Sequence, residues 1–452
     1  AVIYTLLLVW LGGFALLFAW QVFSHLRFSR MLKTHSHPME DLEILAIWAR
    51  VKRDLEIGDL KLGVRAAGAL MSYLIKTQKN ALKHIVTIQR YYAERFMLID
   101  ATAQRSLELT TSLRGRSRKG TLLWLLDQTM TAMGSRLLRS WIEQPLVSRA
   151  DILRRQDAIA YFVDDPFLRD DLRETMKPIH DVERLLSRIA YATVNARDCL
   201  ALLASLKAVP PIAEKLKSTG VARLDELYAM LDPMTDLTEL LEKAISPDAP
   251  LSVKEGGIIR DGYSDELDEY RSASTNGKAW LTNLEAQERE ATGIKNLKVG
   301  FNRVFGYYIE VTKSFYDQVP TMRYVRKQTL ASAERFITEE LKELEKKILG
   351  AEDHATRLEY QLFLGVREFL SAHIVELARV AHALKELDAL LSLAQCAADY
   401  SYVRPSFNQE GVYEIQNGRH AVVEQAIGSD NFVPNDTHMS REGRMMVITG
   451  PN

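Results

Sequence analysis

Residues 297–313 read LKVGFNRVFGYYIEVTK, and their pattern differs from the sequence on either side. β-branched and aromatic residues alternate here with the period of two that is typical of a strand. The alternation predicts two faces, one with Tyr307, Ile309 and Val311 and the other with Tyr308, Glu310 and Thr312. Gly300 and Gly306 indicate bulges or a close approach of the backbone to a neighbour. The stretch is therefore predicted to be β-structure inserted between helices.

The sequence that follows has a helical pattern. No proline occurs between residues 321 and 404, and apolar residues recur at intervals of three and four with charges between them. The stripe consists of Leu341, Leu344, Ile348, Ala351, Ala355, Leu358 and Leu362. It predicts a long helical rod packed along one side, which fits either a lever arm or an ordinary bundle helix.

The sequence before the β-stretch is also mainly helical. Apolar residues recur at helical spacing over residues 42–85, and an amphipathic helix is predicted at 122–141 that ends before Pro145. A short β-like patch at 95–100 lies between these segments. Further helices are expected over residues 150–246, with breaks at Pro166, Pro178, Pro210, Pro211 and Pro233. The predicted fold class is mainly α.

A basic segment surrounds the β-stretch. Residues 291–333 contain seven cations and two anions, a net charge of +5. The cations are Lys295, Lys298, Arg303, Lys313, Arg323, Arg326 and Lys327. Amide- and hydroxyl-bearing residues such as Asn296, Asn302, Gln328 and Thr329 are interleaved with them. This composition favours contacts to phosphates that position a duplex without reading its bases.

A second basic segment is the loop at residues 114–120, RGRSRKG, which carries four cations within six residues. Two interpretations stay open. The loop contacts phosphate, or it is simply solvated.

Composition sets wider limits. A length of 452 residues predicts about three domains. Lys plus Arg is 58, Asp plus Glu is 59, and the net charge of −1 excludes a uniformly basic coat and an acidic disordered chain. Hydrophobic residues make up 47% and charged residues 26%, as in ordinary globular proteins. Cys199 and Cys396 lie too far apart in sequence to indicate a disulfide framework or a zinc site.

The first 26 residues contain no Asp, Glu, Lys or Arg, and Arg27, Arg30 and Lys33 follow. This pattern predicts a transmembrane anchor with a cytoplasmic basic flank. A buried core segment and an artefact such as a misjoined upstream stretch stay open as alternatives, whereas a cleaved signal peptide is disfavoured. Because the chain opens on Ala, we expect the native start to lie upstream.

Several motifs, in order, resemble those of the MutS mismatch-repair family. They are T-x-M-G-x-R-L-L-x-x-W-x-x-x-P-L at 131–146, DVERL at 181–185, VGFNRVFGYYIEVTK at 299–313, RYVRKQTLASAERF at 323–336, GRH at 418–420 and ITGPN at 448–452. The resemblance covers about residues 60–452. It implies a long-helix lever bundle with a small α+β clamp insertion and the first strands of a truncated α/β ATPase domain.

The resemblance also implies a division of the chain. Its parts are an apolar segment of uncertain origin at 1–50, a connector tail at 51–110, core and lever helices at 111–271, a clamp at 272–336, returning lever helices at 337–395, and the start of the ATPase domain at 396–452. The implied DNA contacts are Lys295, Asn296, Lys298, Asn302, Arg303, Arg323, Arg326 and Lys327.

Near the C-terminal end, residues 445–448 form an apolar run of strand type that leads into Thr449. In the family, Gly450 would be the first glycine of a P-loop, GxxxxGK[ST], and Pro451 and Asn452 would follow it. The second glycine, the lysine and the hydroxyl of that motif are absent here. Phe432 matches the position that stacks on adenine. The family is a DNA-dependent ATPase that uses ATP and Mg²⁺, but neither site is complete in this chain and we expect no hydrolysis from it.

The implied function is ATP-regulated binding of mismatched double-stranded DNA. The implied partners are a second copy of the chain and a MutL-type repair protein, in the bacterial cytoplasm near the nucleoid. Two departures limit the resemblance. A mismatch-reading domain has no match upstream of residue 60, and the first fifty residues do not resemble a connector.

Two other functions stay open. The first is a membrane-anchored MutS-related protein with a role other than mismatch repair, which requires that the N-terminal run is a genuine anchor. The second is a helical structural protein with no DNA role, which the clamp motif disfavours.

Overall fold

The computed structural model describes residues 93–447 except 303–305 and 331, together with the helical residues Phe23, Arg27, Gly63, 66–70, Tyr73 and Leu74. The chain divides into two compact units, Ala1–Ala93 and Glu94–Asn452. The second unit is the one described below. Apart from these few positions, the predicted anchor and the helices predicted at 42–85 lie outside the described residues. Within the described residues, no helix is both long and apolar enough to cross a membrane.

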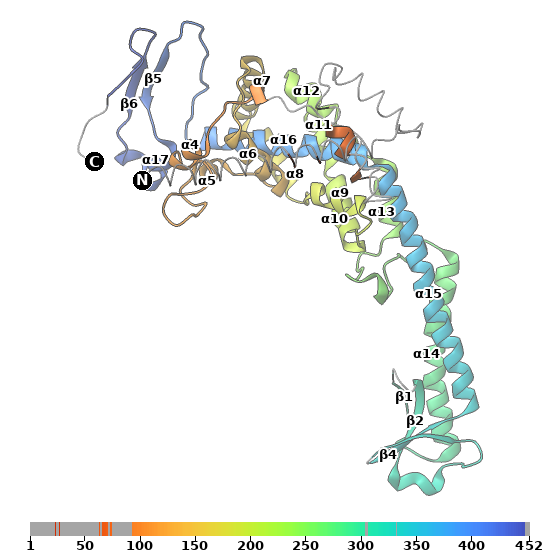
Figure 1. Ribbon diagram of the computed structural model, residues 1–452. Helices are drawn as coiled ribbons and strands as arrows, with labels where there is room; N and C mark the ends of the chain where they lie inside the picture. The colour runs from red at the N-terminus through yellow and green to blue at the C-terminus, as the bar shows by residue number, and fades with distance from the viewer. Residues whose placement is uncertain are drawn as a thin grey trace. The chain divides into compact units, whose positions relative to one another are not determined.

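The helical body consists of short helices packed around α16 (Ile374–Asp399), as Figure 1 shows. The short helices are α4 (Ala101–Ser106), α5 (Leu122–Leu126), α6 (Ala132–Glu143), α7 (Arg149–Asp164), α8 (Pro166–Met176), α9 (Val182–Ala190), α10 (Ala196–Lys207), α11 (Val209–Lys215), α12 (Ala222–Tyr228) and α13 (Thr235–Ala244). Single turns lie at η2 (Ala93–Arg95) and η3 (Val253–Glu255). A helix that is apolar on nearly every side, as α16 is, must be enclosed by neighbours.

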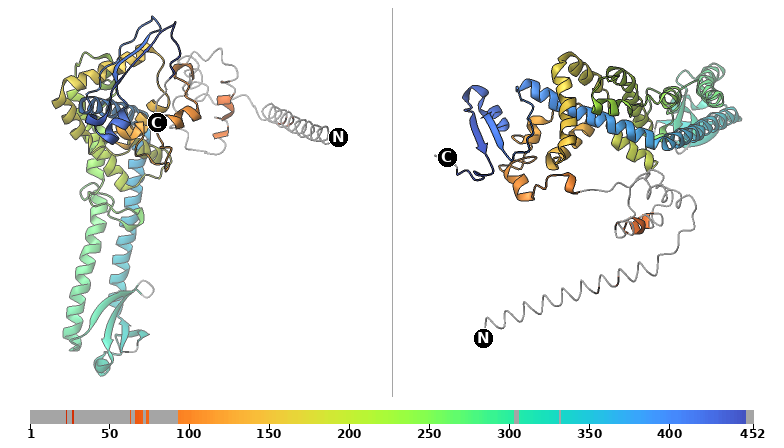
Figure 2. Two further views of the ribbon diagram at one scale, coloured as in Figure 1. Left: turned by 90° about the vertical axis from the view of Figure 1, so that its left-hand side faces the viewer. Right: turned by 90° about the horizontal axis from the view of Figure 1, so that it is seen from above.

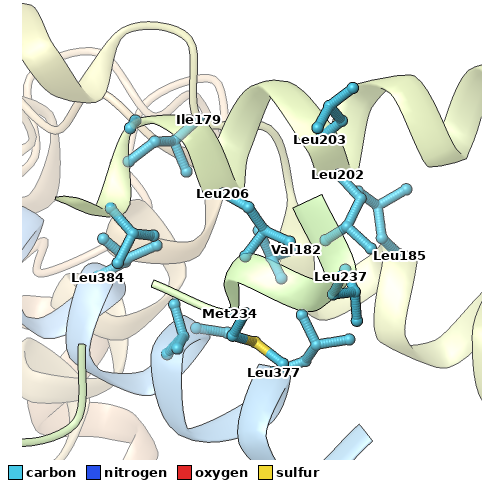
Figure 3. Close-up of a cluster of buried hydrophobic side chains, with 14 of the residues drawn as sticks. Ile179, Val182, Leu185, Leu202, Leu203, Leu206, Met234, Leu237, Leu377 and Leu384 are labelled. Carbon is cyan, nitrogen blue, oxygen red and sulfur yellow. The ribbon is translucent and has the colours of Figure 1, made fainter. Parts of the chain in front are cut away.

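The core of the body forms where these helices meet α16. Leu377 and Leu384 of α16 lie near Val182 of α9 and Leu206 of α10 (Figure 3). All four side chains are buried. Burial of a leucine or valine side chain contributes about 1.5–3 kcal/mol, so this contact region fixes the short helices on α16.

The breaks predicted at the prolines are confirmed. Pro166 is the first residue of α8, and Pro210 and Pro211 lie in the first turn of α11, where a missing N–H removes no helical hydrogen bond. Pro178 and Pro233 lie between helices. The β-like patch at 95–100 is present only as a single bridge, from Phe96 to Leu146.

Two long helices, α14 (Asp265–Thr292) and α15 (Glu339–Ala372), run side by side (Figures 1 and 2). The predicted stripe on α15 is confirmed, since Leu341 and Ile348 are fully buried. The rod is not one continuous helix, because His373 has a non-helical conformation between α15 and α16. Its N–H bonds to the Leu370 carbonyl, and its ring packs on Phe369.

A four-stranded antiparallel sheet lies in the segment between α14 and α15. Its strands are β1 (Lys298–Asn302), β2 (Gly306–Thr312), β3 (Val325–Thr329) and β4 (Ala333–Ile337), in the order β1-β2-β4-β3, with η4 (Lys313–Gln318) after β2. Ile309 pairs with Val299 and Phe336, and Ile309 and Val311 are buried in a small core of their own. The predicted alternation in β2 is confirmed.

The segment after α16 forms a two-stranded sheet, β5 (Tyr413–Gly418) with β6 (Asn435–Met439), with α17 (Ala421–Ile427) and η5 (Ser429–Asn431) between them. The strand expected at 445–448 is wrong for the described residues 445–447, which lie in no strand. An apolar run becomes a strand only where a neighbour offers backbone hydrogen bonds, and neither β5 nor β6 pairs with it.

Candidate nucleic-acid interface

The face of the four-stranded sheet that points away from its core carries an ordered row of polar groups. Lys298 of β1 lies opposite Glu310 of β2, Glu310 lies opposite Arg335 of β4, and Arg335 lies opposite Gln328 of β3. The Arg335 Nε bonds to Glu310 Oε2 at 2.9 Å, and its Nη1 bonds to Gln328 Oε1 at 3.0 Å. The row therefore crosses all four strands, and hydrogen bonds hold its Glu310, Arg335 and Gln328 side chains in place.

An aromatic ring lies beside this row. The Arg335 guanidinium stacks on the Tyr308 ring with 4.0 Å to its centre, an arrangement that is attractive by about 0.5–2 kcal/mol. A Cβ at position 300 would lie 2.8 Å from the Tyr308 ring, so any other residue there would require the ring to shift. This confirms the close approach predicted at Gly300.

Two arginines that were predicted to contact DNA form ion pairs with buried glutamates of the fold. Arg323 Nη2 pairs with Glu288 Oε1 at 2.7 Å, and Glu288, only 1% exposed, also accepts a hydrogen bond from the Tyr324 hydroxyl. Arg326 Nε lies 2.8 Å from Oε2 of the buried Glu334. A buried carboxylate without a paired cation is costly, so each arginine compensates a charge inside the sheet segment.

The lysines of the segment are less engaged. Lys295, Lys298 and Lys313 are exposed, and no ion pair found among the described residues involves them. Lys327 is half-buried, with its Nζ 3.5 Å from the Tyr307 carbonyl oxygen. The exposed lysines thus supply open positive charge on the surface of the segment between α14 and α15.

The remaining predicted residues have separate positions. The Asn296 amide donates to the Thr312 hydroxyl and helps to join β1 to the end of β2. Asn302 is half-buried and pairs across the sheet with Gly306. Arg303 lies outside the described residues. The sequence prediction missed Arg335, because the basic segment was counted only to residue 333. The predicted alternation did separate Tyr308, which stacks on Arg335, from the face that carries Ile309 and Val311.

One side chain of α15 joins this helix to the sheet. Glu345 Oε1 accepts the Tyr307 backbone N–H at 3.0 Å. Gly306, with φ of +70°, lies against the same carboxylate, and a Cβ there would overlap it. The prediction of a close approach at Gly306 is confirmed, and β2 is tied to α15 at this point.

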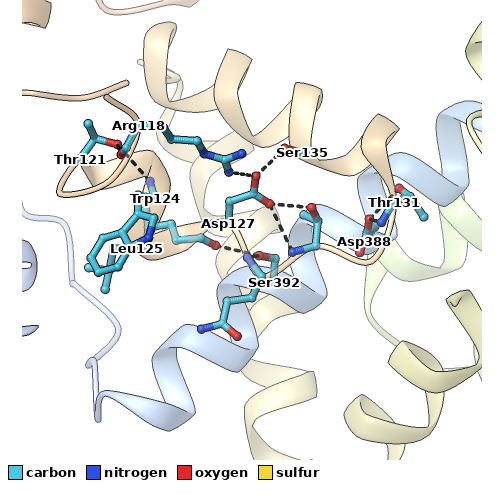
Figure 4. A network of polar contacts seen from close by, with 12 residues as sticks. Arg118, Thr121, Trp124, Leu125, Asp127, Thr131, Ser135, Asp388 and Ser392 are labelled. Carbon is cyan, nitrogen blue, oxygen red and sulfur yellow. Dashed lines mark hydrogen bonds and ion pairs between the residues drawn. The ribbon is translucent and has the colours of Figure 1, made fainter. Parts of the chain in front are cut away.

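A second polar network joins the loop between α5 and α6 to α16 (Figure 4). Asp388 of α16, which is fully buried, accepts hydrogen bonds from the Met130 N–H at 2.8 Å, the Thr131 N–H at 2.8 Å and the Thr131 hydroxyl at 2.6 Å. One turn further along, the Ser392 hydroxyl accepts the Gln128 N–H at 2.8 Å. Burial raises the pKa of Asp388, and the hydrogen bonds from Thr131 oppose that rise.

Asp127 organises the other side of the same loop. It accepts hydrogen bonds from Thr129, Ser135 and Arg118 (Figure 4). Burial pushes its pKa upward, but these three hydrogen bonds together hold the pKa below its usual value. The carboxylate therefore stays charged and fixes the start of α6.

The predicted nucleotide residues are described only in part. Phe432 ends the η5 turn, with its N–H bonded to the Ser429 carbonyl at 3.2 Å and its side chain half-buried. Gly450, Pro451 and Asn452 lie outside the described residues. In the same segment, α17 lies against α5, which leads into the Asp127 loop.

A helical body, two paired long helices and a small sheet flanked by open lysines define a mainly helical protein with a basic β-insertion. The family model described as MutS domain III matches residues 102–394. The chain belongs to the MutS family.

Curated relatives agree with this assignment. The DNA mismatch repair protein MutS of Geobacillus kaustophilus is 50% identical over 388 residues, which cover 86% of this chain and 43% of the relative. The protein of the same name from Acetivibrio thermocellus is 48% identical over 400 residues, covering 88% and 46%. That of Listeria monocytogenes is 48% identical over 388 residues, covering 86% and 45%. The chain spans less than half the length of these relatives.

Proposed function

We propose that this chain is part of a DNA mismatch repair protein of the MutS type, which binds mismatched double-stranded DNA under the control of ATP. The observation that carries the proposal is the surface of the segment between α14 and α15, where the exposed Lys295, Lys298 and Lys313 have no ion-pair partner among the described residues. Unpaired lysines on a folded surface can bind the phosphates of a duplex in a salt-dependent way. We call residues 272–336 the clamp from here on.

The other parts follow the same scheme. We propose a connector tail at 51–110, core and lever helices at 111–271, returning lever helices at 337–395, and the start of an ATPase domain at 396–452. The Glu345 contact to β2 and the Asp388 contact to the α5–α6 loop support the lever role, because they join the start of α15 to the sheet and the middle of α16 to the helical body. A second copy of the chain and a MutL-type protein are the proposed partners.

ATP and Mg²⁺ are proposed as ligands of the whole protein. When bound, ATP would supply the free energy that changes the lever's state. Phe432 would stack on the adenine, which its half-buried position at the end of η5 allows.

The test is duplex binding by the chain as a function of salt, followed by fluorescence anisotropy. The triple variant Lys295→Gln/Lys298→Gln/Lys313→Gln should lose about 0.9 per lysine from the slope of log K against log salt. The matched control is Lys177→Gln/Lys217→Gln/Lys243→Gln, which removes the same charge from exposed positions on the helical body.

One further variant and a comparison of two duplexes sharpen the result. Arg323→Gln should lower the stability of the clamp and leave the salt slope close to that of the wild type, because Arg323 compensates Glu288. Perfect and mismatched duplexes should bind equally well, because lysine contacts to phosphate carry no base information. An unchanged slope in the triple lysine variant would overturn the proposed role of the clamp.

A further inference from the structure

The loop between α4 and α5 carries charge that the clamp does not explain. Arg114, Arg116, Arg118 and Lys119 are all exposed. The loop belongs to the helical body, since the Leu122 and Leu123 N–H groups after it bond to the Glu108 and Leu109 carbonyls before it. The loop is therefore a basic surface of the helical body, separate from the clamp.

Hydrogen bonds give this loop a defined conformation. The Ser112 N–H bonds to the Ser117 carbonyl at 2.9 Å, and the Ser117 N–H bonds back to the Ser112 hydroxyl at 3.1 Å. The Lys119 N–H bonds to the Ser117 hydroxyl at 3.0 Å, and the Thr121 hydroxyl to the Arg118 carbonyl at 2.7 Å. The charged side chains of this loop are therefore presented from a fixed backbone.

The structure sorts the four cations into two groups. Arg118 is held by Asp127, which also fixes the start of α6. Arg114, Arg116 and Lys119 form no ion pair with any described residue. The carboxylate at the base of the loop, Glu108, accepts the Leu113 N–H. Three positive charges thus remain open at the tip.

The backbone at the tip is also arranged for an anion. Gly115 has φ of +84° and Arg116 has φ of +50°, a left-handed conformation that costs a non-glycine residue about 1–2 kcal/mol. Among the described residues, the N–H groups of Arg114, Gly115 and Arg116 have no acceptor. Successive N–H groups in a turn form concavities that bind anions, and strain of this kind is often kept for function.

We propose that residues 112–120, the basic loop, form a second phosphate-binding site that takes the sugar–phosphate backbone of a DNA duplex. The proposal rests on the proposed function, since it extends the duplex contact from the clamp to the helical body. Arginine suits this role because its planar guanidinium matches phosphate oxygens in pairs. Open N–H groups beside the cations add neutral donors for the same oxygens.

The experiment measures duplex binding by the full chain at several salt concentrations. The variant Arg114→Gln/Arg116→Gln/Lys119→Gln should lower the slope of log K against log salt by up to about 2.7 and weaken binding at least several-fold. The control Lys177→Gln/Lys217→Gln/Lys243→Gln removes equal charge from other exposed positions of the body and should bind as the wild type does. Arg114→Lys/Arg116→Lys should recover most of the slope, since it restores the charge.

The possible outcomes separate this site from the clamp. If the loop variant binds like the control while the clamp variant loses slope, the loop proposal is overturned and the clamp stands. If only the loop variant loses slope, the loop stands and the clamp proposal fails. Titration with inorganic phosphate tests the other source of the same chemistry. Phosphate binding that the loop variant lacks, together with unchanged duplex binding, would overturn the assignment to DNA.

Discussion

Gly134 of α6 lies directly against Asp388 of α16. A Cβ at position 134 would lie 2.2 Å from Asp388 Oδ2 and 2.9 Å from Asp388 Cβ. Asp388 cannot move aside without losing the three hydrogen bonds that it accepts from Met130 and Thr131. Glycine at 134 therefore has a packing role.

Gly134→Ala should lower the free energy of unfolding by about 1–3 kcal/mol, the usual cost of overpacking a rigid site. The matched control is Gly350→Ala, in the interior of α15 with nothing within 4 Å of an added Cβ. That change should raise stability by about 0.5–1 kcal/mol, because alanine favours a helix. Urea unfolding of both variants provides the measurement, and an equal gain in both would contradict the packing role.

Asp181 gives a prediction for pH. The two hydrogen bonds from Arg136, each 2.7 Å long, lower its pKa, and partial burial opposes the shift. A carboxylate with a lowered folded pKa stabilises the fold above its unfolded pKa of about 4, and this contribution is lost as pH falls through the folded value.

The stability difference between the wild type and Asp181→Asn should therefore be constant from about pH 5 to 7 and shrink below about pH 4. Asparagine can keep the N-cap of α9, so the comparison isolates the charge. In an Arg136→Met background the pH-dependent part should become smaller, and the Arg184 N–H and the Arg184 charge should account for what remains. A difference that persists undiminished at pH 3 would rule out this ion pair as its source.

Two cations of the clamp show what the sequence alone does not predict about single residues. Lys298 and Arg326 look alike in a count of charge, yet Lys298 is open and Arg326 pairs with the buried Glu334. Sequence places both in a basic segment. Only the register of β3 against β4, with its irregularity between Arg326 and Gln328, decides which cation meets a buried acid.

Among the elements, α15 shows what periodicity can predict. The spacing of three and four placed Leu341 and Ile348 on the buried side, because a helix repeats every 3.6 residues. The break at His373 was not predictable in this way. No glycine or proline lies at this position. The helix breaks there because α15 and α16 pack against different neighbours.

The link between α15 and β2 gives a prediction for the elements. Glu345→Ala removes the acceptor of the Tyr307 N–H, so protection of that amide from hydrogen exchange should fall by about tenfold. Glu345→Gln keeps a side-chain oxygen and should retain most of the protection. Equal protection in all three proteins would show that the carboxylate does not hold β2.

Across the second unit as a whole, the two main hydrophobic cores are separate and unequal in size. The body core lies around α16 in the helical body, and the clamp core joins the sheet to α14 and α15. Separate cores allow regions of a protein to open independently. The clamp core is much the smaller of the two, so the clamp should open first.

A pair of truncations tests this. Ile348→Ala in the clamp core and Leu387→Ala in the body core, both fully buried, should each cost about 2–5 kcal/mol. Hydrogen exchange in Ile348→Ala should rise in β1, β2 and β4 and stay unchanged in α9 and α10. Leu387→Ala should raise exchange in the body. Faster exchange throughout both regions in Ile348→Ala would indicate a single cooperative unit.

The sequence by itself determined the mainly helical class, the β-insertion, the buried stripe of α15 and the proline-marked helix starts, because these depend on periodicity and on local backbone limits. It also carried the motifs of the MutS family. Tertiary structure decided which cations stay open, why Gly134 must be glycine and where the long rod divides. Those features depend on groups far apart in the chain, such as Thr131 and Asp388, whose meeting no local pattern encodes.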